Sequence, residues 1–182
     1  MARISLDPPR TLSYRLGEWY ARRHYGQTLL PGQAAGHNAR VLRTMAMAEW
    51  SLTRWHTVPD ELKQLAVMAA AIRLNCSWCM DFGFWVSYTS GLDPAKLRAV
   101  PRWRESREFS ELERRVLEYA EAMCDTPLAV TDTMVAGLRE HLDEAQIVEL
   151  TMMISIENQR SRFNSALGLT SQGFSDRCPV PV

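Results

Sequence analysis

The sequence of 182 residues predicts an all-α fold of about eight helices. Apolar residues recur at spacings of three and four in several segments, as the buried face of a helix requires. Helix-start signals precede many of these segments. No stretch alternates apolar and polar residues as a half-buried strand does, so no sheet is expected.

The first third of the chain is predicted to contain an arm, two helices and a loop. Pro8 and Pro9 prevent a helix near the N-terminus. Gly26 is placed to end the first helix, and the next connection carries Gly and Pro. The expected ranges are an arm at 1–11, a helix at 12–25, a loop at 28–36 and a helix at 37–55.

Capping signals mark the remaining helices. Pro59 suits a first helical turn, and Ser110 with Glu113 forms a capping box. Asp143 with Gln146 repeats this chemistry before the longest helix. The expected helices run from about 57 to 75, 76 to 90, 94 to 100, 111 to 123, 131 to 141 and 144 to 167.

Composition favours one domain over residues 1–182, with 1–11 and 171–182 as arms. The chain is 46% hydrophobic, which is enough to build a core, and its formal net charge is zero. A neutral chain has no field that attracts nucleic acid or an acidic membrane. We expect no signal peptide, and the longest apolar runs fall short of the ~18 residues that a membrane span needs. We therefore expect no nucleic-acid and no membrane partner.

Cys76 and Cys79 form the feature around which the chain is organised. Two cysteines three residues apart can form a reversible disulfide or hold half of a metal site. If Asn75 caps a helix, Cys76 is its first residue, and the positive end of that helix stabilises a thiolate. The alternative is that both are small buried apolar residues. We favour the redox interpretation.

The other two cysteines do not extend this pair into a metal site or a disulfide scaffold. Cys124 lies in a helical pattern and is expected to be buried, whereas Cys178 lies in a Pro-rich tail and is expected to be exposed or disordered. The four histidines are scattered, so we expect neither a four-ligand zinc site nor a cofactor. This use of cysteine favours a reducing cytoplasm.

A polar cluster over residues 157–164 ends a helix whose earlier part is apolar. It could be an exposed helix end, where Arg160 and Arg162 meet the negative end of the helix dipole. Alternatively, Glu157, Asn158 or Arg160 faces the cysteine helix or a neighbouring subunit. The residues alone leave both possibilities open. The tryptophans, Trp78 among them, could likewise line an apolar substrate pocket or serve packing, which is the commoner use.

Taken in order, these motifs resemble the carboxymuconolactone decarboxylase and alkylhydroperoxidase D-like superfamily from about Leu42 to Leu169. The resemblance implies an alkylhydroperoxidase D-like helical bundle that assembles as trimers or hexamers. The decarboxylase branch lacks the cysteine pair, so the pair favours the redox branch. The matching segments are 62–74, Cys76-Ser77-Trp78-Cys79-Met80-Asp81, Gly91-Leu92-Asp93, 109–120, and 158–169 with Arg162-Phe163-Asn164.

The resemblance also implies roles for the two cysteines. In the alkylhydroperoxidase D-like members the second cysteine attacks a hydroperoxide and becomes a sulfenic acid. The first cysteine then resolves it as a disulfide, and a reductant restores the dithiol. Carried over, Cys79 is peroxidatic and Cys76 is resolving. Trp78, Phe82 and Arg160 are the candidate substrate-contacting residues.

The sequence departs from the family motif at two positions of its proton relay. Gly83 stands where the family carries His, and Gln64 stands where it carries Glu. Asp81 and Glu157 are the candidates to replace this relay, although a carboxylate near a thiol raises the pKa of the thiol unless it acts as a base.

We therefore expect a thiol-dependent, peroxidase-like oxidoreductase. Its substrate would be a small hydroperoxide or related electrophile, and its reductant an unidentified protein or thiol. The alternatives are a lyase or isomerase of the carboxymuconolactone decarboxylase type, or a non-catalytic redox-sensing oligomer.

Overall fold

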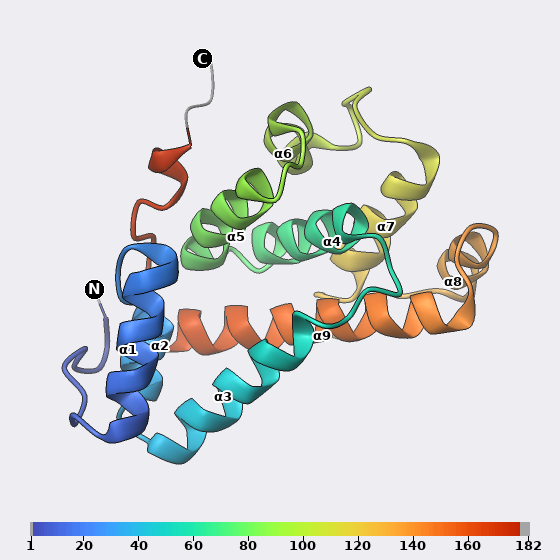
Figure 1. Ribbon diagram of the computed structural model, residues 1–182. Helices are drawn as coiled ribbons and strands as arrows, with labels where there is room; N and C mark the ends of the chain where they lie inside the picture. Colours follow the sequence, from blue (N-terminus) through green and yellow to red (C-terminus); the bar gives the residue numbers. More distant parts are fainter. Residues whose placement is uncertain (1, 179–182) are drawn as a thin grey trace. The chain divides into compact units, whose positions relative to one another are not determined.

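The computed structural model describes residues 2–178 (Figure 1). In this part the chain has nine α-helices, two short 3-10 helices and no strand, which confirms the predicted all-α class. The α-helices are α1 (Leu12–Tyr25), α2 (Leu30–Ala35), α3 (Ala39–Leu52), α4 (Asp60–Arg73), α5 (Ser77–Thr89), α6 (Pro94–Ala99), α7 (Glu111–Ala122), α8 (Asp132–Arg139) and α9 (Glu144–Ala166). The 3-10 helices are η1 (Val100–Arg102) and η2 (Ser175–Arg177).

The chain divides into two compact units. Of the described residues, 2–55 and 166–169 form unit 1, and 56–165 and 170–178 form unit 2. Both cysteines of the organising pair and every candidate site residue belong to unit 2. A single domain spanning the whole chain therefore stays a prediction.

Unit 1 contains α1, α2 and α3. The Thr11 hydroxyl caps α1 by accepting the Tyr14 N–H, and Gly26 ends it with a φ of 76°. The predicted loop at 28–36 is wrong over 30–35, where α2 forms. Proline is tolerated in the first turn of a helix, where Pro31 lies. The short helix also buries two alanines that a loop would leave exposed, Ala34 and Ala35.

Unit 2 is built around α4, which packs between α5 and α7 (Figure 1). Leu65, Ala66 and Ala70 of α4 are fully buried. Because two of these three residues are alanines, neighbouring helices can approach α4 closely while the interior stays densely packed. Two residues of α9, Leu150 and Ile154, are fully buried in the same core.

Local capping positions the helices that carry the site. Ser110 and Glu113 form the predicted capping box of α7, with bonds of 2.7 and 3.3 Å. Asp143 and Gln146 bond reciprocally at 2.8 and 3.0 Å at the start of α9. Both signals are confirmed. Among the described residues, no helix has the length and apolar character needed to cross a membrane.

Candidate functional site

Cys76 and Cys79 are joined by a disulfide at the start of α5, with their Cα atoms 5.2 Å apart. They are almost fully buried, at 1% and 5% exposure. The helix cap is Cys76 and not Asn75, which corrects the expectation, because Asn75 has a φ of 51° while an N-cap needs extended backbone. The Cys76 sulfur accepts the Cys79 N–H at 3.3 Å. A sulfur at this position meets the positive end of the helix.

A stripe of polar side chains on α9 faces this disulfide. Glu157, Ser161 and Asn164 follow one another at spacings of four and three, which places them on one side of the helix. All three are buried, at 3%, 1% and 1% exposure. Ser161 Oγ lies 3.4 Å and Asn164 Nδ2 lies 3.3 Å from the Cys79 sulfur. The polar cluster predicted at the end of α9 therefore faces the cysteine helix through these residues.

Glu157 is linked to Cys79 through the Ser161 hydroxyl. That hydroxyl donates to Glu157 Oε1 at 2.9 Å, and Arg160 Nη1 pairs with Glu157 Oε2 at 3.4 Å. Sulfur, hydroxyl and carboxylate thus form a continuous chain from α5 to α9. Such a chain can carry a proton from a thiol to a carboxylate without direct contact between them.

Asp81 lies two residues beyond Cys79, but its carboxylate bonds to the C-terminal segment. It accepts the backbone N–H groups of Gln172, Phe174 and Ser175 and the Ser175 hydroxyl, at 2.7–3.1 Å. Burial raises the pKa of Asp81, but these four donors outweigh burial and leave it below its usual value. We therefore assign Asp81 a structural role in place of the predicted catalytic one.

Trp78 and Phe82, two of the expected substrate-contacting residues, stack on each other with ring centroids 4.9 Å apart. The Trp78 indole donates to Gln172 Oε1 at 2.8 Å, and Phe82 meets Phe174 edge-on. Phe174 is fully buried, so the described part of the expected C-terminal arm, residues 171–178, packs on α5. Trp78 is buried and Phe82 is half-buried, and both rings contact the C-terminal segment. The third expected contact, Arg160, is half-buried and directed at Glu157.

Gly83, which replaces the histidine of the family motif, allows α5 to approach α4 closely. A Cβ added at this glycine would lie 2.9 Å from the sulfur of Met68. A histidine here would therefore displace the buried Met68 side chain. Gln64, at the other relay position, lies half-buried on α4.

Cys124 is buried, as predicted, and lies outside the disulfide. Its sulfur donates to the Ala120 carbonyl and accepts the Asn158 amide at 3.4 Å, and burial raises the pKa of its thiol. Cys178, expected to be exposed or disordered, is half-buried near Asp81. The Asp81 carboxylate binds backbone N–H groups between residues 172 and 175 and so holds the segment that carries Cys178 against α5. This contact explains why Cys178 is less exposed than expected.

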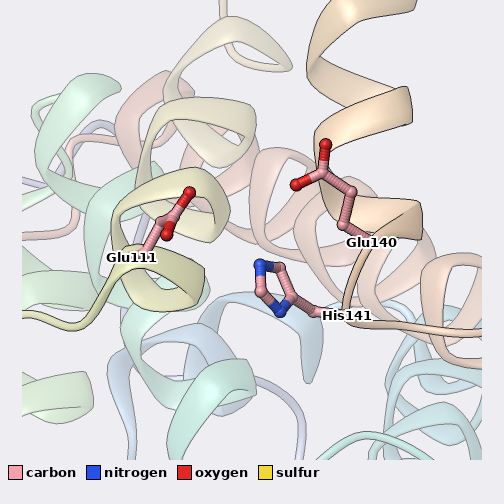
Figure 2. A group of neighbouring side chains, drawn as sticks. All are labelled: Glu111, Glu140 and His141. Carbon is pink, nitrogen blue, oxygen red and sulfur yellow. The ribbon is translucent and has the colours of Figure 1, made fainter.

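A separate group of possible metal ligands lies on the surface of unit 2. Figure 2 shows Glu111 of α7 facing Glu140 and His141, which follow α8. All three are exposed, and the Arg115 guanidinium already pairs with Glu111 at 2.7 Å and with Glu140 at 3.0 Å. A metal ion would have to displace this guanidinium. We interpret the group as a surface ion-pair cluster, and the expectation of no metal centre stays a prediction.

Ser161 and Asn164 were not among the site residues predicted from the sequence. Both lie in the polar cluster 157–164, and Asn164 also lies in the segment that resembles the family, but neither is assigned a role from the sequence. One signal could have found both: they lie four and seven residues after Glu157, on the same helical face. This spacing identifies Ser161 and Asn164 as site residues only if Glu157 is already known to point toward the cysteines.

Known proteins match this chain in both sequence and structure. The profile of the Carboxymuconolactone decarboxylase family matches residues 39–122. The uncharacterized protein YnjA of Escherichia coli K12 is 35% identical over 165 residues, which are 90% of this chain and 88% of YnjA. The chain belongs to the carboxymuconolactone decarboxylase family.

Solved structures place this family member in the alkylhydroperoxidase D-like fold. An uncharacterized peroxidase-related protein of Ralstonia eutropha JMP134, described as an alkylhydroperoxidase AhpD core, superposes with a TM-score of 0.85 at 14% identity, over 100% of this chain and 98% of that one. The debrominase Bmp8, in complex with 2,3,4-tribromopyrrole, superposes with a TM-score of 0.83 at 17% identity, over 97% and 96% of the two chains. At these identities the likeness establishes the fold alone.

Proposed function

We propose that this family member is a thiol-dependent oxidoreductase that uses Cys79 and Cys76 to reduce a small hydroperoxide or related electrophile. The observation that carries the proposal is the chain from the Cys79 sulfur through Ser161 to Glu157, with spacings of 3.4 and 2.9 Å. A general base linked to a thiol is the arrangement that generates a reactive thiolate. Here Glu157 takes the place of the missing Glu and His of the family motif.

In the reduced protein, Cys79 passes its proton to Ser161 while Ser161 passes its own to Glu157. The Cys79 thiolate attacks the terminal oxygen of the hydroperoxide, so the S–O bond forms as the O–O bond breaks. The departing alkoxide receives the proton that Glu157 returns through Ser161 and leaves as an alcohol. The products are a sulfenic acid at Cys79 and the alcohol.

Cys76 then attacks the sulfenic sulfur of Cys79. The disulfide forms, and the hydroxyl leaves as water with the proton of the Cys76 thiol. The Cys79 N–H, 3.3 Å from the Cys76 sulfur, stabilises negative charge on Cys76 during this step. An external dithiol, either a protein or a small thiol, supplies the two electrons that restore both cysteines. This need for a reductant fits a reducing cytoplasm.

We propose that the substrate contacts the two half-buried candidates, Phe82 on α5 and Arg160 on α9, and the Trp78 ring through its stack on Phe82. These contacts are part of the proposal, as is the choice of electrophile. A hydroperoxide is the leading candidate. Because Bmp8, a debrominase, shares the fold, a brominated pyrrole is the second electrophile to test.

We also propose that the protein works as a homo-oligomer, a trimer or hexamer. Large apolar side chains are exposed on two helices of unit 1: Leu12 and Trp19 on α1 at 72% and 66%, and Met47 and Trp50 on α3 at 71% and 62%. Clusters of exposed apolar residues on a monomer are typical of association surfaces.

Turnover of cumene hydroperoxide with dithiothreitol as reductant tests the function. We expect Cys79→Ser to abolish turnover and Cys76→Ser to stop at a sulfenic acid that dimedone traps. Ser161→Ala and Glu157→Gln should lower the rate by about 10²–10⁴-fold, the usual contribution of a general base. Hydroperoxide turnover that survives Cys79→Ser would overturn the mechanism. Conversion of a lactone acid that does not require either cysteine would favour the lyase alternative.

A further inference from the structure

The carboxamide of Asn164 faces both sulfur atoms of the pair. Its Nδ2 lies 3.3 Å from the Cys79 sulfur and 4.0 Å from the Cys76 sulfur. Asn164 is only 1% exposed, and Cys79 is 5% exposed. A thiolate removed from water in this way is unfavourable unless an N–H or O–H group donates to it. Asn164 offers such an N–H at hydrogen-bonding distance from the sulfur.

Ser161, the other side-chain neighbour of Cys79, directs its proton away from the sulfur as long as Cys79 is a thiol. A hydroxyl has one proton, and Ser161 directs it to Glu157 at 2.9 Å, a shorter contact than the 3.4 Å to the Cys79 sulfur. A lone pair of the Ser161 oxygen therefore faces the sulfur and can accept the thiol proton. The two neighbours of Cys79 thus differ: Ser161 accepts the thiol proton and can donate to the thiolate only after that transfer, whereas the Asn164 N–H can donate to the sulfur throughout.

The oxygen end of the Asn164 amide has no partner among the protein atoms of residues 2–178. Among the buried side-chain nitrogen and oxygen atoms of residues 2–178, Asn164 Oδ1 makes no hydrogen bond. Buried polar groups that serve stability alone are nearly always paired at both ends, because an unpaired one is destabilising. Within the described part of the protein, Asn164 is thus paired through its nitrogen, and that nitrogen lies on the sulfurs.

We propose that Asn164 stabilises the Cys79 thiolate of the reduced protein by donating its Nδ2–H to the sulfur. The proposal rests on the proposed dithiol function and adds a residue to it. The Ser161–Glu157 chain removes the thiol proton, and Asn164 holds the resulting negative charge. Both are needed for Cys79 to be reactive near neutral pH.

The pH dependence of Cys79 reactivity tests the proposal. The test uses reduced full-length protein with the substitution Cys76→Ser, which keeps a capping side chain on α5. This protein reacts with methyl methanethiosulfonate at a series of pH values, and mass spectrometry measures the rate at which the peptide that contains Cys79 is modified. We expect Asn164→Leu to raise the pH midpoint of Cys79 reactivity by about one to two units. At a pH below both midpoints, the variant then has a thiolate fraction about 10- to 100-fold smaller than that of the parent. The matched control is Asn158→Leu, on the same helix, whose amide contacts Cys124 instead. Its midpoint should equal that of the parent.

The midpoint separates this role from a structural one. A loss of packing at position 164 changes the melting temperature or the plateau rate at high pH, but it leaves the midpoint where it was. If Asn164→Leu does not fold, Asn164→Ala gives the same measurement. A midpoint equal to the parent's in a folded variant overturns the proposal. Because the reagent reacts with any thiolate, this result does not depend on whether the protein reduces hydroperoxides.

Discussion

Replacing Asp81 by asparagine is expected to release residues 171–178 from α5 while the rest of unit 2 stays folded. Asp81 Oδ1 accepts from the Ser175 N–H and hydroxyl, and Oδ2 accepts from the N–H groups of Gln172 and Phe174. Asparagine keeps one acceptor oxygen and turns an NH₂ group toward two N–H donors. At ~1.5–3 kcal/mol for each hydrogen bond to a charged group, the two lost bonds cost about 3–6 kcal/mol. Burial of the Phe174 side chain, at about 1.5–3 kcal/mol, equals at most the lower end of this loss.

The same contact should fail at low pH in the parent protein. The four donors keep the pKa of Asp81 below its usual value, although burial acts to raise it. A carboxylate whose pKa is lower in the folded state than in the unfolded state stabilises the fold above the unfolded pKa. This contribution is therefore complete above about pH 4 and is lost as the pH falls through the folded pKa. We therefore expect the segment to be released as the pH falls from about 4 through the lower pKa of the folded state.

Hydrogen exchange read by mass spectrometry measures the release directly. The backbone amides of Gln172, Phe174 and Ser175 should exchange faster in Asp81→Asn than in the parent at pH 7. Asp176→Asn, an exposed carboxylate in the same segment, is the matched control and should leave exchange unchanged. Parent-like protection of these three amides in Asp81→Asn would refute the reasoning.

Three further outcomes are expected. Gly36→Ala should destabilise the protein by about 1–3 kcal/mol in thermal unfolding, because a Cβ there would lie 2.8 Å from ring carbons of Pro8 and Tyr14. The control is Gly32→Ala, whose Cβ would have nothing within 4 Å, and it should be neutral or slightly stabilising. Iodoacetamide at neutral pH should label Cys178 before Cys124, since burial raises the pKa of both thiols and Cys124 is the more buried; faster labelling of Cys124 would contradict this. Light scattering should return a mass above 20.8 kDa, and a monomer at micromolar concentration would refute the proposed oligomer.

Features that depend on a few neighbouring residues could be predicted from the sequence. The capping box of Ser110 and Glu113 and the pair Asp143 and Gln146 are local, and both form as expected. The loop at 28–36 could not be predicted in the same way. The helix α2 within it has only six residues, and burial of its alanines within unit 1 explains it better than any local signal.

The candidate site depends on a contact that is distant in the sequence. Ser161 meets Cys79 across 82 residues, so no local pattern determines which face of α9 turns toward α5. The sequence offered an exposed helix end and an inward-facing cluster as alternatives for residues 157–164. The apolar residues earlier in α9 bury one side of the helix, as Leu150 and Ile154 show. Glu157, Ser161 and Asn164 continue that side, at successive spacings of three or four from Ile154.

Asp81 shows why proximity in the sequence is a poor guide to a site on a helix. Successive residues rotate by about 100° around the helix axis, so Asp81 lies about 200° around α5 from Cys79. Its carboxylate consequently faces the C-terminal segment, while the sulfur of Cys79 faces α9. Glu157, 78 positions further along the chain than Cys79 by number, reaches that sulfur through one hydroxyl. The proposed base of this buried thiol thus lies on α9, and not among the residues that follow the thiol on its own helix.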